Sequence, residues 1–198
     1  MPPTAGNFST NPTIFLRLKQ SDPQPREVAW DEFTARYAPV IRAFAQKLGV
    51  RAHDVDDVVQ DVLLGFFLKS PTFVYDPNKG RFRGYLKVCT YRAIKSRAGG
   101  VARLHNQPLD CIAEDALAVE QVWADVWEDQ LLQRALDEVR QTMSETKAFR
   151  AFQLYVMLGQ PAQAVAERLD MHIKSVYRAK EQITQLLQAK VAAMTEEN

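Results

Sequence analysis

The stretch Asp54-Val-Asp-Asp-Val-Val-Gln-Asp61, continued by Val62-Leu-Leu-Gly-Phe-Phe67, decides how this chain folds. Its apolar residues recur at steps of three and four, the period of one buried face of an α-helix. They are Val55, Val58, Val59, Val62, Leu63 and Phe66. The opposite face carries Asp54, Asp57, Gln60, Asp61 and Leu64, with Asp56 at its edge. Asp54 is the predicted N-cap, and early acids favour the positive end of the helix dipole.

The four acids of this stretch exceed the one or two that capping requires, and two interpretations remain open. The first is a solvated N-terminal helix face, which is the usual meaning of a charge run. The second is an acidic docking surface for a basic partner. The rest of the chain has to decide between them.

Charge is segregated along the chain, although the net charge is only +1. From Lys79 to Arg103 there are eight Lys and Arg residues and no Asp or Glu. From Asp110 to Glu138 the acids dominate, and Arg134 is the single base. A basic segment beside an acidic one indicates different partners in different places, so the small net charge does not exclude nucleic acid.

The composition, 46% apolar and 25% charged over 198 residues, is that of an ordinary soluble globular protein. No run approaches the roughly 18 apolar residues of a membrane span, and the N-terminus lacks the pattern of a signal peptide. Cys89 and Cys111 have no metal-ligand spacing, and the three histidines are scattered. We therefore expect a reduced, cytoplasmic location, with no metal, no cofactor and no membrane partner.

Helical periodicity recurs along the rest of the chain, and no strand-like alternation survives beside it. We predict helices over residues 14–18, 26–48, 54–69, 81–97 and 119–140, with Gly49 as the C′ residue of the second. Thr142-Met-Ser-Glu145 has the capping-box pattern, which predicts a helix from there to Gly159. Residues 161–169 and 173–192 form a predicted helix-turn-helix. The fold class is all-α, with two small helical domains joined by a flexible linker over residues 101–118.

The C-terminal helix pair matches a DNA-reading hairpin. In that geometry the N-terminal end of the second helix enters the major groove. The candidates there are Lys174, Ser175, Tyr177, Arg178 and Lys180. The alternative is an ordinary short helix pair.

The basic helix at 81–97 and the loop before it suit unstacked bases. Cations track a nucleic-acid backbone while aromatic rings stack on bases, and here Tyr85 and Tyr91 interleave with Lys and Arg. The loop adds Phe73 and Tyr75. The alternative is a solvated basic face with aromatic rings that cap the core.

Taken together, the motifs resemble an extracytoplasmic-function (ECF, group IV) sigma factor of bacterial RNA polymerase. The resemblance runs from about Asn11 to Ala192. It is carried by Trp30…Phe33…Tyr37, Asp54-x-Asp-Asp-Val-Val-Gln-Asp-Val, Phe82-Arg-Gly-Tyr-Leu, Val-Ala-Glu-Arg-Leu and Ser-Val-Tyr-Arg-Ala-Lys. It implies a disordered N-terminus over 1–11, sigma region 2 over 12–100, a linker over 101–118, sigma region 4 over 119–192 and a tail over 193–198. It also implies a non-enzymatic protein that directs promoter-specific initiation.

The resemblance further implies a role for each surface. The core-polymerase-binding residues would be Asp54, Asp56, Asp57, Gln60 and Asp61. The −10 element, melted, would meet Phe73, Tyr75, Asn78, Lys79, Tyr91, Arg92 and Lys95. The −35 element, in duplex form, would be read by Lys174, Ser175, Tyr177, Arg178 and Lys180. The chain departs from the family at Asp56, where Glu is usual, at Gln182, where Arg is frequent, and at Asp170, where Gly is usual.

Two other functions remain as alternatives. A stand-alone helix-turn-helix regulator with a ligand-sensing or dimerising N-terminal domain would leave the acidic helix unexplained. A magnesium-dependent isoprenoid synthase needs an acid at the fifth place of its motif, where this chain has Gln60. Control by an anti-sigma factor or by a Ser/Thr kinase is also compatible with the resemblance, although the intact acids predict docking without phosphorylation.

Overall fold

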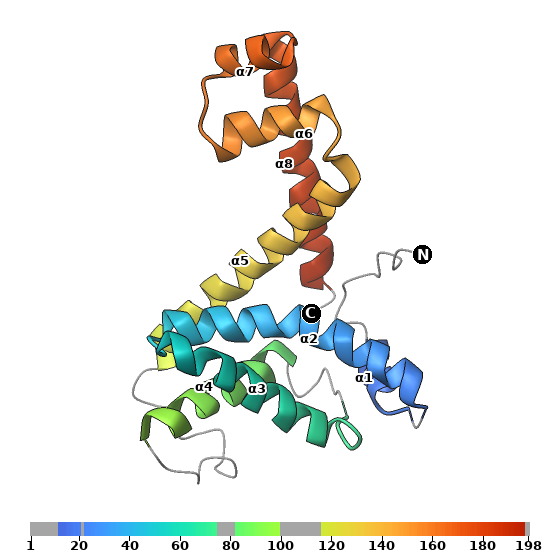
Figure 1. Ribbon diagram of the computed structural model, residues 1–198, viewed down its shortest axis with the longest axis vertical. Coiled ribbons are helices and arrows are strands. Elements are labelled where there is room, and N and C mark those ends of the chain that lie inside the picture. The colour runs from blue at the N-terminus through green and yellow to red at the C-terminus, as the bar shows by residue number, and fades with distance from the viewer. Residues whose placement is uncertain (1–11, 21, 75–81, 100–115, 197–198) are drawn as a thin grey trace. The chain divides into compact units, whose positions relative to one another are not determined.

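The computed structural model describes residues 12–20, 22–74, 82–99 and 116–196, and all regular structure in these ranges is helical (Figure 1). The predicted all-α class is therefore confirmed. The expected disordered N-terminus and most of the expected linker lie outside the described residues. The elements in chain order are α1 (Pro12–Leu18), α2 (Pro23–Lys47), α3 (Ala52–Lys69), α4 (Phe82–Gly99), α5 (Ala116–Met143), α6 (Lys147–Phe152), the π-helical turn η4 (Gln153–Met157), α7 (Ala162–Leu169) and α8 (Ile173–Glu196).

Two helix starts differ from their predictions. Arg51, not Asp54, is the N-cap of α3, because the Asp54 backbone N–H already donates to the Arg51 carbonyl at 2.8 Å. Asp54 instead lies in the first turn, where its charge still suits the helix dipole. The predicted capping box is also wrong. The Thr142 hydroxyl donates to carbonyls in the last turn of α5, and Thr146 caps α6 by accepting from the Phe149 backbone N–H at 3.1 Å.

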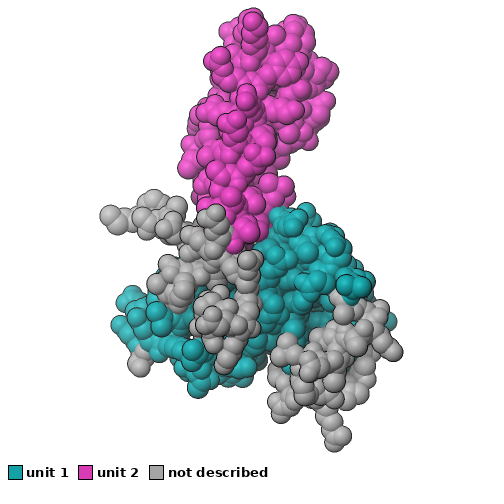
Figure 2. All heavy atoms as spheres, turned by 180° about the vertical axis from the view of Figure 1, so that it is seen from behind, with its two compact units in different colours: residues 1–130, 197–198 teal, residues 131–196 magenta. Residues whose placement is uncertain are grey.

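The chain divides into two compact units (Figure 2). Unit 1 ends at Gln130 and unit 2 spans Leu131–Glu196, so the division lies within α5. Across the described ranges, none of the helices is both long and apolar enough to cross a membrane.

The core of unit 1 is aromatic and lies between α2, α3 and α4, which run side by side in Figure 1. Phe33 of α2 stacks on Phe66 of α3 with ring centroids 4.5 Å apart, and Phe82 of α4 lies edge-on to both rings. Phe15 of α1 covers this cluster, 4.9 Å from Phe82. Each of these four side chains is at most 5% exposed, so the predicted apolar faces of α2 and α3 do form the core.

The first half of α5 belongs to unit 1 and adds two tryptophans to it. Trp123 lies edge-on to Phe44 of α2 at 4.8 Å, and Trp127 approaches Tyr37 at 6.4 Å. Both indoles are at most 3% exposed. The Trp123 Nε1 atom is buried and has no hydrogen-bond partner among the described residues.

Unit 2 is built on small side chains at the helix-turn-helix. Val165 and Ala166 of α7 pack on Val176 and Ala179 of α8, with Ala151 of α6 beneath them. Small residues let three short helices approach closely, which is how a unit of this size fills its core. The helix predicted to run on to Gly159 changes at Gln153 into η4, where the Leu158 N–H donates to the Gln153 carbonyl at 3.0 Å.

Candidate functional site

The acidic face predicted on α3 lies on the outside of unit 1. Asp56, Asp57, Gln60 and Asp61 are exposed and Asp54 is half-buried, while the apolar stripe beneath them is core. Helical spacing places these five polar side chains within about two turns of one another. The structure therefore brings the predicted docking residues together on one surface, which we call the acidic face.

Arg97, near the end of α4, bridges two carboxylates of the acidic face. Its Nε and Nη2 atoms donate to Asp61 Oδ2 at 2.9 and 2.7 Å, and its Nη1 donates to Asp57 Oδ2 at 2.9 Å. The hydrogen bond to Asp61 and the charges of both acids raise the pKa of Arg97 above its ordinary value. Sequence reasoning missed this contact, because nothing in the sequence fixes the angle at which α4 crosses α3.

The other two acids also have basic side chains beside them. Arg42 of α2 pairs with Asp56 at 2.5 Å, and His53 Nε2 lies 3.3 Å from Asp54. All of these carboxylates keep more than a third of their side-chain area in solvent. Exposed ion pairs stabilise a protein by roughly 0–1 kcal/mol, so a partner that presents several cations can displace them.

Phe73, in the loop after α3, lies partly in the core. Phe73 is half-buried, with ring centroids 5.4 Å from Phe15, 5.3 Å from Phe66 and 5.5 Å from Tyr85. Its ring thus forms an edge of the aromatic cluster and stays partly exposed to solvent. The predicted contacts at Tyr75, Asn78 and Lys79 lie outside the described residues.

The predicted −10 residues of α4 lie together on its outer side. Tyr91 and Arg92 are half-buried and Lys95 is exposed, with the Lys95 Nζ atom 5.4 Å from the centroid of the Tyr91 ring. On the side of α4 that faces α3, burial raises the pKa of the Tyr85 hydroxyl and of the Cys89 thiol, so both groups stay neutral. The outer side of α4 thus offers cations and a ring, which suits a single strand.

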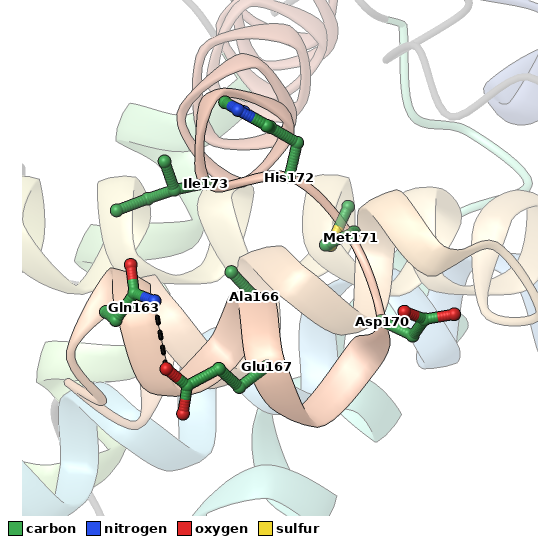
Figure 3. Close-up of a pocket in the computed structure, with 7 residues that line it drawn as sticks. All are labelled: Gln163, Ala166, Glu167, Asp170, Met171, His172 and Ile173. Carbon is green, nitrogen blue, oxygen red and sulfur yellow. Dashed lines mark hydrogen bonds between the residues drawn. The ribbon is translucent and has the colours of Figure 1, made fainter.

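The helix-turn-helix turns at Asp170, whose φ of 48° places it in the left-handed region (Figure 3). Asp170 thus adopts the left-handed conformation that glycine adopts most easily, at a position where glycine is usual in the family that the sequence resembles. The next turn is closed by His172, whose Nδ1 accepts from the Lys174 backbone N–H at 3.1 Å. Figure 3 shows Gln163 donating to Glu167 one turn further along α7; both residues line the hollow beside this turn.

At the start of α8 the predicted base-reading residues mostly face solvent. Lys174, Tyr177, Arg178 and Lys180 are exposed, and Ser175 is half-buried. Tyr177 lies edge-on to Tyr155 at 5.7 Å, and Lys180 Nζ is 5.8 Å from the same Tyr155 ring. Val176 and Ala179 hold the opposite side of the helix in the core, so the outer side is fixed in orientation.

No group of three or more His, Cys, Asp and Glu side chains in the described ranges could hold a metal ion. The candidate functional residues form separate surfaces: the acidic face of α3 and the aromatic and basic side of α4 in unit 1, and the start of α8 in unit 2. Each surface is carried by a helix whose other side is core.

Residues 33–102, which carry the acidic face and the basic helix, match the family model of sigma-70 region 2. The chain therefore contains a sigma-70 region 2 domain. Sigma factors, the proteins that carry this domain, are non-enzymatic and act in transcription initiation. None of the curated proteins matches the chain.

The chain also matches a solved structure titled "Structure of CnrH in complex with the cytosolic domain of CnrY". The identity is 17%, and the match covers 92% of this chain and 97% of that chain with a TM-score of 0.37.

Proposed function

We propose that this chain is a sigma factor that binds core RNA polymerase through the acidic face of α3 and directs it to promoters with −10 and −35 elements. The observation that carries this proposal is that the region 2 match covers most of α2 and all of α3 and α4. These helices present the acidic face and the outer side of α4 with Tyr91, Arg92 and Lys95, which we call the basic stripe. One rigid unit can therefore hold a protein partner on one helix and DNA on another.

Arginines of the chain itself already pair with the acidic face. A docking partner must therefore offer these acids more positive charge than those arginines do. Asp57 and Asp61 share a single guanidinium, that of Arg97, so each keeps unused acceptor capacity. A helical partner surface with several Lys or Arg residues would bind both acids and release Arg97. We therefore assign polymerase binding to Asp54, Asp56, Asp57, Gln60 and Asp61.

DNA contacts follow from exposure and charge. Tyr91, Arg92 and Lys95 form the described part of the −10 surface, to which we add the half-buried ring of Phe73. In unit 2 the exposed start of α8 would read the −35 element in the major groove. There a good base contact discriminates by about 1–3 kcal/mol, whereas a phosphate contact adds mainly salt-dependent affinity.

The decisive experiment is reconstitution with core polymerase. Asp57→Arg and Asp61→Arg should each abolish core binding, measured by fluorescence anisotropy of labelled chain, and should abolish promoter-selective run-off transcription. Asp31→Arg is the matched control, because Asp31 is an equally exposed acid on α2 of the same unit. Far-UV circular dichroism should be unchanged in all three variants. Core affinity equal to that of wild type in Asp57→Arg and Asp61→Arg would refute the docking assignment.

The same experiment addresses the alternative of a stand-alone regulator, which would bind duplex DNA specifically without polymerase. Since RNA polymerase works in the bacterial cytoplasm, the proposed partner also places the chain there. An anti-sigma factor or a Ser/Thr kinase stays a prediction of the family resemblance. Addition of phosphate mimics, such as Thr72→Glu, should not be needed for core binding.

A further inference from the structure

Lys87 of α4 lies in line with the proposed −10 residues but was not among them. It is one helical turn before Tyr91, which is one turn before Lys95, and side chains four apart are neighbours on a helix surface. The Lys87 side chain is 22% exposed, so its ammonium reaches solvent from beside the core. The spacing of Lys87, Tyr91 and Lys95 was the sequence signal that could have found it.

Glu120 of α5 binds Lys87 in unit 1. A Glu120 carboxylate oxygen accepts a hydrogen bond from Lys87 Nζ, and the Glu120 side chain is 55% exposed. The carboxylate therefore lies where a phosphate oxygen of a bound strand would lie if Lys87 contacted DNA. Both groups are anionic acceptors for an ammonium, so only one of them can occupy it fully.

The first half of α5 is anchored so that Glu120 stays at this position. Arg83, one turn before Lys87, lies over the Trp127 ring with 5.3 Å from Cζ to the ring centroid. At the other end of the segment Asp129 pairs with Lys47 of α2 at 3.6 Å. With the buried Trp123, these contacts place an acidic helix along the edge of the basic stripe of α4.

We propose that Lys87 is a further phosphate-binding residue for the −10 strand, and that Glu120 occupies it in the DNA-free chain. This inference rests on the proposed function of the α4 surface. The pair is partly exposed, and such pairs change an equilibrium by about two- to five-fold, so a phosphate can replace Glu120. The contact therefore weakens DNA binding without preventing it.

Removal of the Glu120 charge should make Lys87 available to DNA. Glu120→Gln should tighten binding of a single strand by about two- to five-fold. Lys87→Ala should instead flatten the slope of log K against log salt concentration by about 0.7, because one phosphate fewer is neutralised and its counterions stay bound to the DNA.

The test is a double-mutant cycle on the full chain with a fluorescein-labelled single-stranded DNA of mixed sequence, followed by anisotropy at several NaCl concentrations. Mixed sequence suffices because phosphate contacts carry no sequence information. The four proteins are wild type, Glu120→Gln, Lys87→Ala and the double variant. Glu128→Gln is the matched control, since Glu128 is exposed on the same half of α5 and pairs with no described residue. Tryptophan fluorescence checks that α5 stays in place.

The proposal expects a gain in Glu120→Gln that is absent in the Lys87→Ala background and absent in Glu128→Gln. No gain in Glu120→Gln, or an equal gain in either of the other comparisons, overturns it. Core-polymerase binding of the same proteins separates this outcome from failure of the proposed function. If the wild type and its variants all bind core polymerase but Glu120→Gln gains no DNA affinity, only the Glu120 inference is refuted. If the wild type itself fails to bind core polymerase, the proposed function is refuted.

Discussion

Replacement of Trp123 by alanine tests whether the first half of α5 is part of unit 1. The Trp123 side chain is 1% exposed and packs on Phe44 of α2, with ring centroids 4.8 Å apart. If α5 belongs energetically to unit 1, the substitution should lower the free energy of unfolding of that unit. Unit 2 should be unaffected, because Trp123 precedes its first residue, Leu131.

The magnitude follows from two opposed terms. Deletion of a buried tryptophan side chain costs about 3–5 kcal/mol through lost transfer energy and a cavity. The Trp123 Nε1 group, however, is buried without a partner among the described residues, and its removal relieves a penalty of about 1–3 kcal/mol. We therefore expect the lower end, about 3 kcal/mol. Trp123→Phe keeps a ring and removes the N–H, so its cost should be about 1 kcal/mol or less.

The assay is urea unfolding followed by two spectroscopic probes. All three tryptophans, Trp30, Trp123 and Trp127, lie in unit 1, so tryptophan fluorescence reports that unit alone, while far-UV circular dichroism reports both. Trp123→Ala should lower the fluorescence midpoint by about 1–3 M urea at ordinary m values. Leu117→Ala, at an 89% exposed position of the same helix, should leave it within error. A fluorescence midpoint unchanged in Trp123→Ala would refute the packing argument.

Three further predictions concern single groups. Arg97→Ala should tighten core-polymerase binding by about two- to five-fold, because it frees two docking carboxylates; weaker binding in anisotropy would show instead that Arg97 orients them. Asp170→Gly should stabilise unit 2 by about 0.5–1 kcal/mol in thermal unfolding by circular dichroism, because glycine tolerates the φ of 48° better, and Asp170→Val should destabilise it. Burial raises the pKa of Cys89 and of Tyr85 above their ordinary values of 9.0 and 10.0, so unit 1 should be fully stable below about pH 9 and lose stability as the pH rises further. A double Cys89→Ser, Tyr85→Phe variant should flatten that alkaline fluorescence-detected loss, and an equally steep loss in the variant would contradict the assignment.

Periodicity predicted the helices and their buried faces well, because burial of an apolar stripe is a local property of the sequence. The stripe of α3 is core as expected, and Gly49 takes the positive φ of 79° that its C′ position requires. Helix starts were less predictable. A threonine hydroxyl can cap a helix by accepting from a backbone N–H, or it can donate to a carbonyl of the preceding helix turn. The Thr142 hydroxyl donates to carbonyls of α5, so it does not cap the next helix.

The candidate surfaces were predicted as residue sets, but their ion pairs were not. The contact of Arg97 with Asp61 joins residues 36 apart, and that of Lys87 with Glu120 joins residues 33 apart. Such contacts depend on how helices cross, which is set by packing in the core and not by spacing along the chain. The sequence prediction also assigned Trp123 and Trp127 to the second domain, over residues 119–192. It did not indicate that these two residues would pack in unit 1.

In unit 1, each surface that we propose to bind a partner is paired in the free chain with a residue of opposite charge. Arg97 lies on the acidic face, and Glu120 lies on the basic stripe of α4. These pairs are partly exposed, so each can be exchanged for a partner's charge at a cost of about 1 kcal/mol or less. A polymerase surface or a DNA strand offers several charges at once and replaces them together, whereas a single ion gains little. Internal pairing of this kind therefore weakens binding to single stray charges more than binding to an extended, complementary partner, such as the polymerase surface proposed above.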